Sequence, residues 1–301
     1  MSIRPVKSIT PATHTMEGAG VHLHRAFGFG DTEAFDPFLL FDDFRNDRPE
    51  DYRPGFPWHP HRGIETITYV LAGTVDHGDS LGNQGSLGAG DVQWMTAGSG
   101  ILHQEMPKGD AAGRMHGFQL WANLPSSLKM SAPRYQDIGS SEIPIVGDDD
   151  GTLVRVICGR YGDKAGPVDG IAAEPRYLDI SVPAGRTKTF AVETYRQAFA
   201  YVFEGSGTFR DASDPVGVLT EKELPDGSET LVRETAGNRS LVLFSSGDSV
   251  TVTAGPDGIR FLLVSGRPIR EPVAWYGPIV MNTEAEIHTA MTDLNRGTFI
   301  K

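Results

Sequence analysis

Two short motifs carry residue types that could hold a metal ion. His59 and His61 lie two positions apart in FPWHPHRGIET, and His103 and Glu105 lie two positions apart in GSGILHQEM. Successive residues of a strand point to opposite faces, so each pair would present both of its side chains on one face. Imidazole and carboxylate are common ligands of divalent transition metals. Two such pairs meeting inside a small β-barrel would therefore hold a metal.

A His-x-His pair alone is more often two ordinary surface or core histidines, so the second pair strengthens the prediction. The stretch GAGDVQWMTAGSGI before His103 is typical of strand, turn and strand. Periodicity does not decide which carboxylate would be the fourth ligand. Glu65 has the same strand parity as His59 and His61, so both Glu65 and Glu105 could face the barrel interior. Arg62 has the opposite parity and is expected to point away as a structural ion-pair residue.

Composition limits the class of protein. The chain has 301 residues and a formal charge of −12, without a block of Lys and Arg that could neutralise phosphates, which disfavours direct nucleic-acid binding. No segment approaches the roughly twenty apolar residues of a membrane span, and the start lacks a long apolar stretch. The single cysteine, Cys158, lies among apolar β-formers and is expected to be a buried core residue. A cytoplasmic protein without an internal disulfide is predicted.

Short apolar runs bounded by Gly, Pro, Asp or Ser recur along the chain and predict an all-β fold. The strand-like runs cover 36–44, 63–77, 90–98, 117–124, 152–159, 176–185, 198–209, 239–255 and 259–266. Helical spacing appears only over Thr283–Asn295, where Thr283 and Glu286 form a capping-box pair ahead of Gly297. We expect this C-terminal helix to pack on a barrel.

The two parts of the chain follow one plan. ETITYVLAGTVDH resembles FAYVFEGSGTF, and LGAGDVQWM resembles FSSGDSVTV, which indicates a duplicated barrel. Pro, Ser and Asp interrupt the strand pattern over 125–151, with a short helical turn expected at 126–130. We predict an N-terminal metal-binding barrel over 1–135 and a C-terminal barrel without metal over 136–301.

Five motifs together resemble the pirins, two-domain members of the cupin superfamily: HPHRGIETITYVLAG, GDVQWMTAGSGILHQEMP, HGFQLWANLPSSLKM, DPFLLFDDF and REPVAWYGPIVMNT. The resemblance implies two stacked jelly-roll barrels, with one metal per chain, usually iron as Fe(II), in the first. It implies His59, His61, His103 and Glu105 as ligands, leaving Glu65 behind them or facing the substrate. Ligand type alone also permits Zn, Mn, Ni, Co or Cu.

The resemblance further implies a dioxygenase that cleaves a flavonol such as quercetin with dioxygen, with Glu105 accepting the proton of the flavonol hydroxyl. Phe118 and Trp121 would offer stacking area where they face inward, although at least one of them is expected in the core. His116 and Gln119 would either line the mouth of the barrel or form a hydrogen-bonded pair that joins two strands.

A second function class is open. The resemblance also implies a regulatory protein that binds a transcription factor or a metabolic enzyme, in which a change in iron charge would bias a neighbouring loop. The glycine-rich segment 18–36, which carries His22, His24 and Arg25, is where such a loop is expected, against the alternative of an ordinary surface segment. A storage or purely structural cupin is a third alternative, disfavoured because four protein ligands leave positions open on iron.

Overall fold

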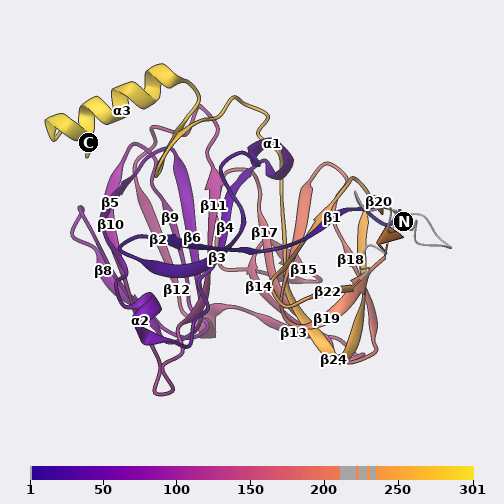
Figure 1. Cartoon of the computed structure of the whole chain (residues 1–301). Helices are drawn as coiled ribbons and strands as arrows, with labels where there is room; N and C mark the ends of the chain where they lie inside the picture. Colours follow the sequence, from indigo (N-terminus) through magenta and orange to yellow (C-terminus); the bar gives the residue numbers. More distant parts are fainter. Residues whose placement is uncertain (1, 211–221, 224–228, 231–234) are drawn as a thin grey trace.

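The computed structural model describes residues 2–210, 222–223, 229–230 and 235–301, and within them the chain forms two β-barrels that lie side by side (Figure 1). Each of the nine predicted runs contains strand. The predicted all-β class, with two barrels and a C-terminal helix, is confirmed. None of the described helices is long and apolar enough to cross a membrane.

The first barrel is built from two facing sheets. The larger sheet runs, in spatial order, β12 (Arg134–Ile138), β9 (Val92–Thr96), β6 (Ile64–Ala72), β11 (His116–Asn123), β4 (Phe38–Asp43), β3 (Val21–Phe27) and β2 (Thr13–Glu17). The smaller sheet runs β5 (Phe56–His61), β10 (Ile101–Lys108), β7 (Thr74–Asp79) and β8 (Gln84–Leu87). Burial alternates along β10, so that His103 and Glu105 share the buried face with Ile101.

The second barrel is one continuous set of paired strands. Its main path is β1 (Val6–Pro11), β23 (Ser240–Phe244), β19 (Gln197–Phe209), β24 (Ser249–Gly266), β17 (Arg176–Val182), β14 (Leu153–Cys158) and β13 (Ile145–Gly147), with β18 (Thr187–Ala191) paired to β24 and β22 (Thr235–Gly237) paired to β19. Short ribbons pair β15 (Arg160–Tyr161) with β16 (Lys164–Ala165), β20 (Lys222–Glu223) with β21 (Glu229–Thr230), and β25 (Ala274–Tyr276) with β26 (Ile279–Met281). Val, Ile, Leu and Phe fill its interior, and Cys158 is buried as predicted.

An aromatic layer joins the two barrels. Phe41 and Phe118 of the first barrel pack against Phe199 and Tyr201 of the second. The Tyr201 hydroxyl donates to Asp43 at 2.8 Å across this layer. Burial of these large rings, with a paired hydroxyl, favours a fixed contact between the barrels.

Each end of the chain packs on the barrel that is farther from it in the sequence. β1 pairs with β23 of the second barrel, and the buried Arg4 donates to backbone carbonyls there. Conversely, β26 lies against Arg62 of the first barrel. Figure 1 accordingly shows the N-terminus beside the second barrel and the C-terminus beside the first. The chain crosses between β12 and β13, so the expected boundary at residue 135 falls inside β12.

Few helices accompany the strands in the described parts of the chain. They are α1 (Thr32–Phe35), α2 (Pro49–Tyr52), the 3-10 turn η1 (Ser140–Glu142) and α3 (Glu284–Arg296). The predicted C-terminal helix is confirmed, since Thr283 and Glu286 form the capping box and Gly297 ends α3 in the left-handed conformation. The expected turn at 126–130 is present, with Lys129 N–H donating to the Pro125 carbonyl.

Candidate metal centre

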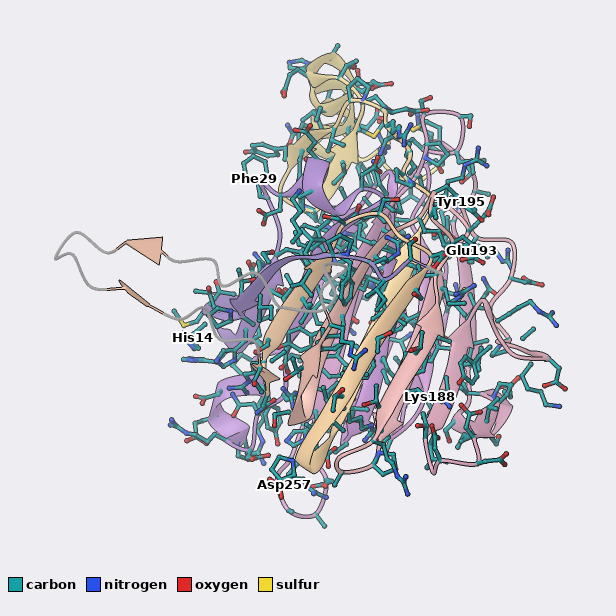
Figure 2. The ribbon with its side chains drawn as sticks, turned by 90° about the vertical axis from the view of Figure 1, so that its right-hand side faces the viewer. His14, Phe29, Lys188, Glu193, Tyr195 and Asp257 are labelled. Carbon is teal, nitrogen blue, oxygen red and sulfur yellow. The ribbon has the colours of Figure 1, made fainter. Side chains whose placement is uncertain are left out.

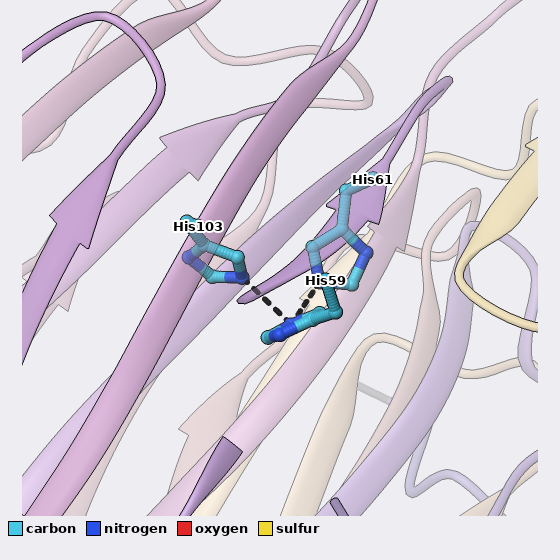
Figure 3. Close-up of side chains that lie close together, drawn as sticks. All are labelled: His59, His61 and His103. Carbon is cyan, nitrogen blue, oxygen red and sulfur yellow. Dashed lines mark hydrogen bonds between the residues drawn. The ribbon is translucent and has the colours of Figure 1, made fainter. Parts of the chain in front are cut away.

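Three imidazole rings converge inside the first barrel. β5 and β10 pair antiparallel so that His59 lies directly opposite His103, and His61 follows two positions along β5. The Nε2 atom of His59 is 3.1 Å from Nε2 of His61 and 2.9 Å from Nε2 of His103. Figure 3 shows the three rings turned toward one point. The predicted pairs therefore do meet, at least through their histidines.

Backbone carbonyls fix the tautomer of two of these rings. His59 Nδ1 is 2.9 Å from the Pro57 carbonyl and His61 Nδ1 is 3.1 Å from the Pro278 carbonyl. A carbonyl only accepts, so each Nδ1 must carry the proton and each Nε2 presents a lone pair. Two lone pairs facing each other at 3.1 Å repel, unless a cation lies between them.

The third ring has an unsatisfied nitrogen. Nδ1 of His103 is buried and has no hydrogen-bond partner. If the proton of His103 is on Nε2, then Nδ1 is a buried acceptor without a donor. If the proton is on Nδ1, that N–H has no acceptor, and the lone pair of Nε2 becomes the third one directed at the centre. Either arrangement costs free energy in the absence of a cation.

Burial keeps all three rings neutral. It lowers the pKa of His59, and together with the neighbouring His59 it lowers the pKa of His61 to about 3. Burial, followed by the charges of His61 and His59, holds the pKa of His103 well below its usual range. Neutral imidazole is the form that binds metal. Within the described parts of the chain, this is the one group of three such side chains close enough to share an ion, and its donors fit a divalent metal.

Glu105 lies on the same buried face but outside the histidine cluster. It shares a cavity with His59 and His61, and the Thr68 hydroxyl lies 3.0 Å from its Oε1. Burial raises the pKa of Glu105 to about 7. Its role as a fourth ligand stays a prediction.

Glu65 does not line this cavity, so of the two positions expected for it the one that faces the substrate is wrong. A turn at Arg62 and Gly63 separates β5 from β6, so strand parity does not carry from His61 to Glu65. Glu65 instead shares its face of β6 with Ile67 and Tyr69, which pack toward the second barrel, and it accepts from Thr96 at 2.8 Å.

Arg62 is the structural ion-pair residue that its parity predicted. The residue is 1% exposed, and its guanidinium reaches Asp293 of α3 at 2.9 Å, the Phe299 carbonyl at 2.9 Å and the Ser99 carbonyl at 2.6 Å. Gly63 has a φ of 78°, and a Cβ there would lie 2.0 Å from the Val280 carbonyl oxygen. Only glycine permits the C-terminal segment to pack this closely behind the histidines.

A cavity of about 570 Å³ opens beside the histidines. Trp121 lines it, with its ring centroid 5.1 Å from that of His61, whereas Phe118 is buried between the barrels. Gln119 also lines the cavity and does not pair with His116, which contacts Asp47 near the surface at 2.6 Å. Trp121 and Gln119 are therefore the two inward residues of β11.

Distant segments that local patterns did not place also line the cavity. β2 supplies Glu17, β3 supplies Arg25 and β4 supplies Asp42. The C-terminal ribbon supplies Trp275 and Pro278. The segment 18–36 is thus partly a cavity wall, although His22 and His24 lie on the opposite face of β3 from Arg25. His22 contacts His14 at 3.0 Å, and His24 contacts Arg239 at 3.2 Å.

Sequence reasoning missed a further histidine on the interior side. His77 on β7 lies opposite Glu105, and Asp79 lies opposite His103. Directly opposed residues of paired strands share a face, so both belong to the inner face behind the cluster. The spacing His77-x-Asp79, the same as in the two predicted pairs, could have identified these residues from the sequence.

Comparisons with known proteins identify the same family in both parts of the chain. A family model described as Pirin matches residues 20–122, and a model described as Pirin C-terminal cupin domain matches residues 177–300. A pirin-like protein of Caulobacter vibrioides is 44% identical over 300 residues, covering 99% of this chain and 100% of the relative.

Two solved structures are informative. Quercetin 2,3-dioxygenase of Acinetobacter baumannii is 31% identical, with a TM-score of 0.85, and the match covers 99% of both chains. The bacterial pirin YhhW of Escherichia coli, solved in complex with nickel(II), is 20% identical with a TM-score of 0.62, and the match covers 87% of this chain and all of that one. At this identity the second likeness shows the fold alone.

Proposed function

The chain belongs to the pirin family, and from that premise we propose that it is an iron-dependent dioxygenase that cleaves a flavonol such as quercetin. The observation that carries the proposal is the convergence of three neutral imidazoles beside a cavity that contains both Glu105 and Trp121. The name of the Acinetobacter baumannii structure supports the same reaction class.

The proposed ligands are His59, His61, His103 and Glu105, holding one Fe(II) per chain. A bound divalent iron would supply Lewis-acid polarisation and one-electron redox chemistry in a site with open positions. Glu105 lies two positions after His103 on the same face of β10 and lines the cavity, where it would accept the proton of the flavonol hydroxyl. Overall, one dioxygen is consumed and one carbon monoxide is released for each flavonol cleaved.

The remaining residues bind and orient the substrate. Trp121 presents an aromatic face at the edge of the histidine cluster, where a planar ring can stack. Leu40, Phe44 and Met115 line other parts of the wall and exclude water from the ring system. Thr68 holds the Glu105 carboxyl in place.

The test is a metal-defined assay. Purified protein is loaded anaerobically with Fe(II), mixed with quercetin and exposed to air, while loss of flavonol absorbance and release of carbon monoxide are followed. We expect both to occur at matching rates. Metal-free protein and protein loaded with Zn(II), which lacks redox chemistry, serve as controls. Iron-loaded, folded protein that leaves quercetin intact would contradict the proposal.

The regulatory alternative has its own supporting observation. Loop residue Phe29, which is 78% exposed, follows β3 at the cavity mouth, and Figure 2 shows it at the periphery of the molecule. A partner protein that binds at Phe29 would respond to the oxidation state of the iron. In that case the Fe(II) and Fe(III) forms must differ in partner affinity, since a partner that binds two states equally shifts neither.

A further inference from the structure

A row of polar side chains crosses the inner face of the larger sheet of the first barrel. Directly opposed residues on adjacent strands form it: Thr68 on β6 faces Gln119 on β11, Gln119 faces Asp42 on β4, and Asp42 faces Arg25 on β3. All four line the cavity. Adjacent strands lie about 4.8 Å apart, so the row extends roughly 14 Å along the sheet.

The first end of the row touches the proposed metal site. Thr68 Oγ1 lies 3.0 Å from Glu105 Oε1 and 2.7 Å from Gln119 Oε1. A hydroxyl has one proton, so Thr68 accepts from one neighbour and donates to the other. In either orientation of its amide, Gln119 contacts Thr68 with one polar group and keeps the other available to the cavity.

The other end of the row holds more carboxylates than cations. Arg25 binds Asp42 through two hydrogen bonds of 2.8 Å and Glu17 through one contact of 2.8 Å. Two carboxylates against one guanidinium leave a net negative charge, and each carboxylate oxygen keeps a free lone pair. This end therefore offers acceptors to a ligand and repels anions.

Apolar side chains flank the row on both sides, because strand residues two positions away share its face. Trp121 and Leu40 lie on one side of Gln119 and Asp42, and Phe44 and Leu23 lie on the other. Trp275 extends the aromatic side toward the mouth, with its ring 6.1 Å from Trp121 and 5.6 Å from the exposed Phe29. A flat ring carrying hydroxyl donors at its edge matches a polar band between two apolar surfaces.

We propose that Gln119, Asp42 and Arg25 form a recognition row that selects flavonols by free hydroxyl groups on the phenyl ring remote from the histidines, and that rejects anionic conjugates of that ring. The inference rests on the proposed function for the identity of the ring system. It adds the residues that set specificity and the substituents they accept.

The test measures binding without turnover. Calorimetric titration of the iron-loaded protein under anaerobic conditions compares galangin, kaempferol and quercetin, which carry none, one and two hydroxyl groups on the phenyl ring. A quercetin sulfate esterified on the same ring is the anionic probe. We expect quercetin to bind about tenfold more tightly than galangin, the effect of a hydrogen bond to a charged group, and the sulfate ester to bind at least about tenfold more weakly than quercetin.

Asp42→Asn is the diagnostic variant. It removes one charge, so the preference for quercetin over galangin should fall to within about twofold, while the partly released Arg25 should improve binding of the sulfate ester. Asp179→Asn is the matched control, because Asp179 pairs with Arg260 in the same two-bonded way, at 3.0 and 2.7 Å, but lies between the barrels. Thermal unfolding of both variants separates a local change in affinity from general destabilisation.

The outcomes separate this inference from the proposed function. Equal binding of the three flavonols, tight binding of the sulfate ester, or equal effects of Asp42→Asn and Asp179→Asn would overturn the recognition row even if quercetin is cleaved. Graded anaerobic binding that Asp42→Asn abolishes would support the row even if no cleavage follows in air. Absence of any flavonol binding would overturn both.

Discussion

His61 donates its Nδ1 proton to the carbonyl of Pro278 at 3.1 Å, a contact between residues 217 positions apart in the sequence. The contact fixes which nitrogen of His61 faces the candidate metal centre, and it makes the C-terminal ribbon part of that centre. An outer hydrogen bond of this kind tunes both the orientation and the basicity of an imidazole ligand.

Glu105→Ala is expected to lower metal affinity by more than about tenfold, the loss typical of even an outer partner, while Glu65→Ala should retain the metal. Glu105 faces the histidine cavity, whereas Glu65 bonds Thr96 on the other face of its strand. Equilibrium dialysis with elemental analysis gives both affinities. Metal loss in Glu65→Ala but not in Glu105→Ala would reverse the assignment of the carboxylate.

One divalent metal per chain is expected. Combined replacement of His59, His61 and His103 by alanine should abolish binding in the full-length protein. His14→Ala is the control, because it removes an exposed histidine that contacts His22 and should leave the stoichiometry unchanged. Two equivalents in the wild-type protein, or one retained in the triple variant, is the contrary result.

His103→Ala should stop quercetin consumption and leave the chain folded. The truncated side chain leaves a polar space that water can fill, and most of the stability resides in the apolar interiors of the barrels. Circular dichroism and thermal unfolding check the fold, and carbon monoxide release checks activity. Full activity after this change would exclude His103 from the reaction.

Glu65→Gln should change how stability depends on pH. Burial raises the pKa of Glu65 to about 7 from an ordinary value of 4.5, so the folded protein binds a proton more tightly than the unfolded chain does. This contribution is fully present below pH 4.5 and is lost as the pH rises through 7. The loss is at most about 3 kcal/mol, and the glutamine variant should not show it.

Urea unfolding of metal-free protein at pH 5 and pH 8 measures this difference. We expect Glu65→Gln and wild type to have similar free energies of unfolding at pH 5, and the variant to be more stable at pH 8. A variant that is less stable than wild type at pH 8 would show that the Glu65 carboxylate is stabilising when charged.

Arg62→Ala should destabilise the protein by about 3 kcal/mol and weaken metal binding. Arg62 joins Asp293 and the Phe299 carbonyl to the turn behind His61, and its guanidinium stacks on the Phe299 ring at 4.1 Å. Asp293→Asn is the milder comparison, since the two bonds of Arg62 to carbonyls survive. Unchanged metal affinity in a destabilised Arg62→Ala protein would show that α3 acts on stability alone.

The period of two along a strand was sufficient to predict that His59 and His61 share one face of their strand. It also placed His103 as a candidate ligand of the same metal. It failed for Glu65, because a glycine turn with positive φ resets the direction of side chains between β5 and β6. It was also insufficient to rank Phe118 against Trp121, since adjacent residues of β11 face two different apolar environments, the cavity and the layer between the barrels.

Residues brought in by long-range packing were the least predictable. Pro278 and Trp275 reach the cavity only because the C-terminal ribbon returns to the first barrel, and no local pattern encodes that return. Arg25 was noted within a glycine-rich segment, but its pairing with Asp42 depends on the order of strands in the sheet. A cytoplasmic location stays a prediction from composition.

The return of the C-terminal ribbon to the first barrel also affects the order in which contacts form during synthesis. The histidines emerge from the ribosome long before residues 274–301, and domains generally fold as they emerge. Until that last segment arrives, His61 lacks its carbonyl partner and Arg62 lacks Asp293 and Phe299. The hydrogen bonds that orient His61 and anchor Arg62 can therefore form only after residues 278–299 have been made, although the strands that carry both residues come early in the sequence.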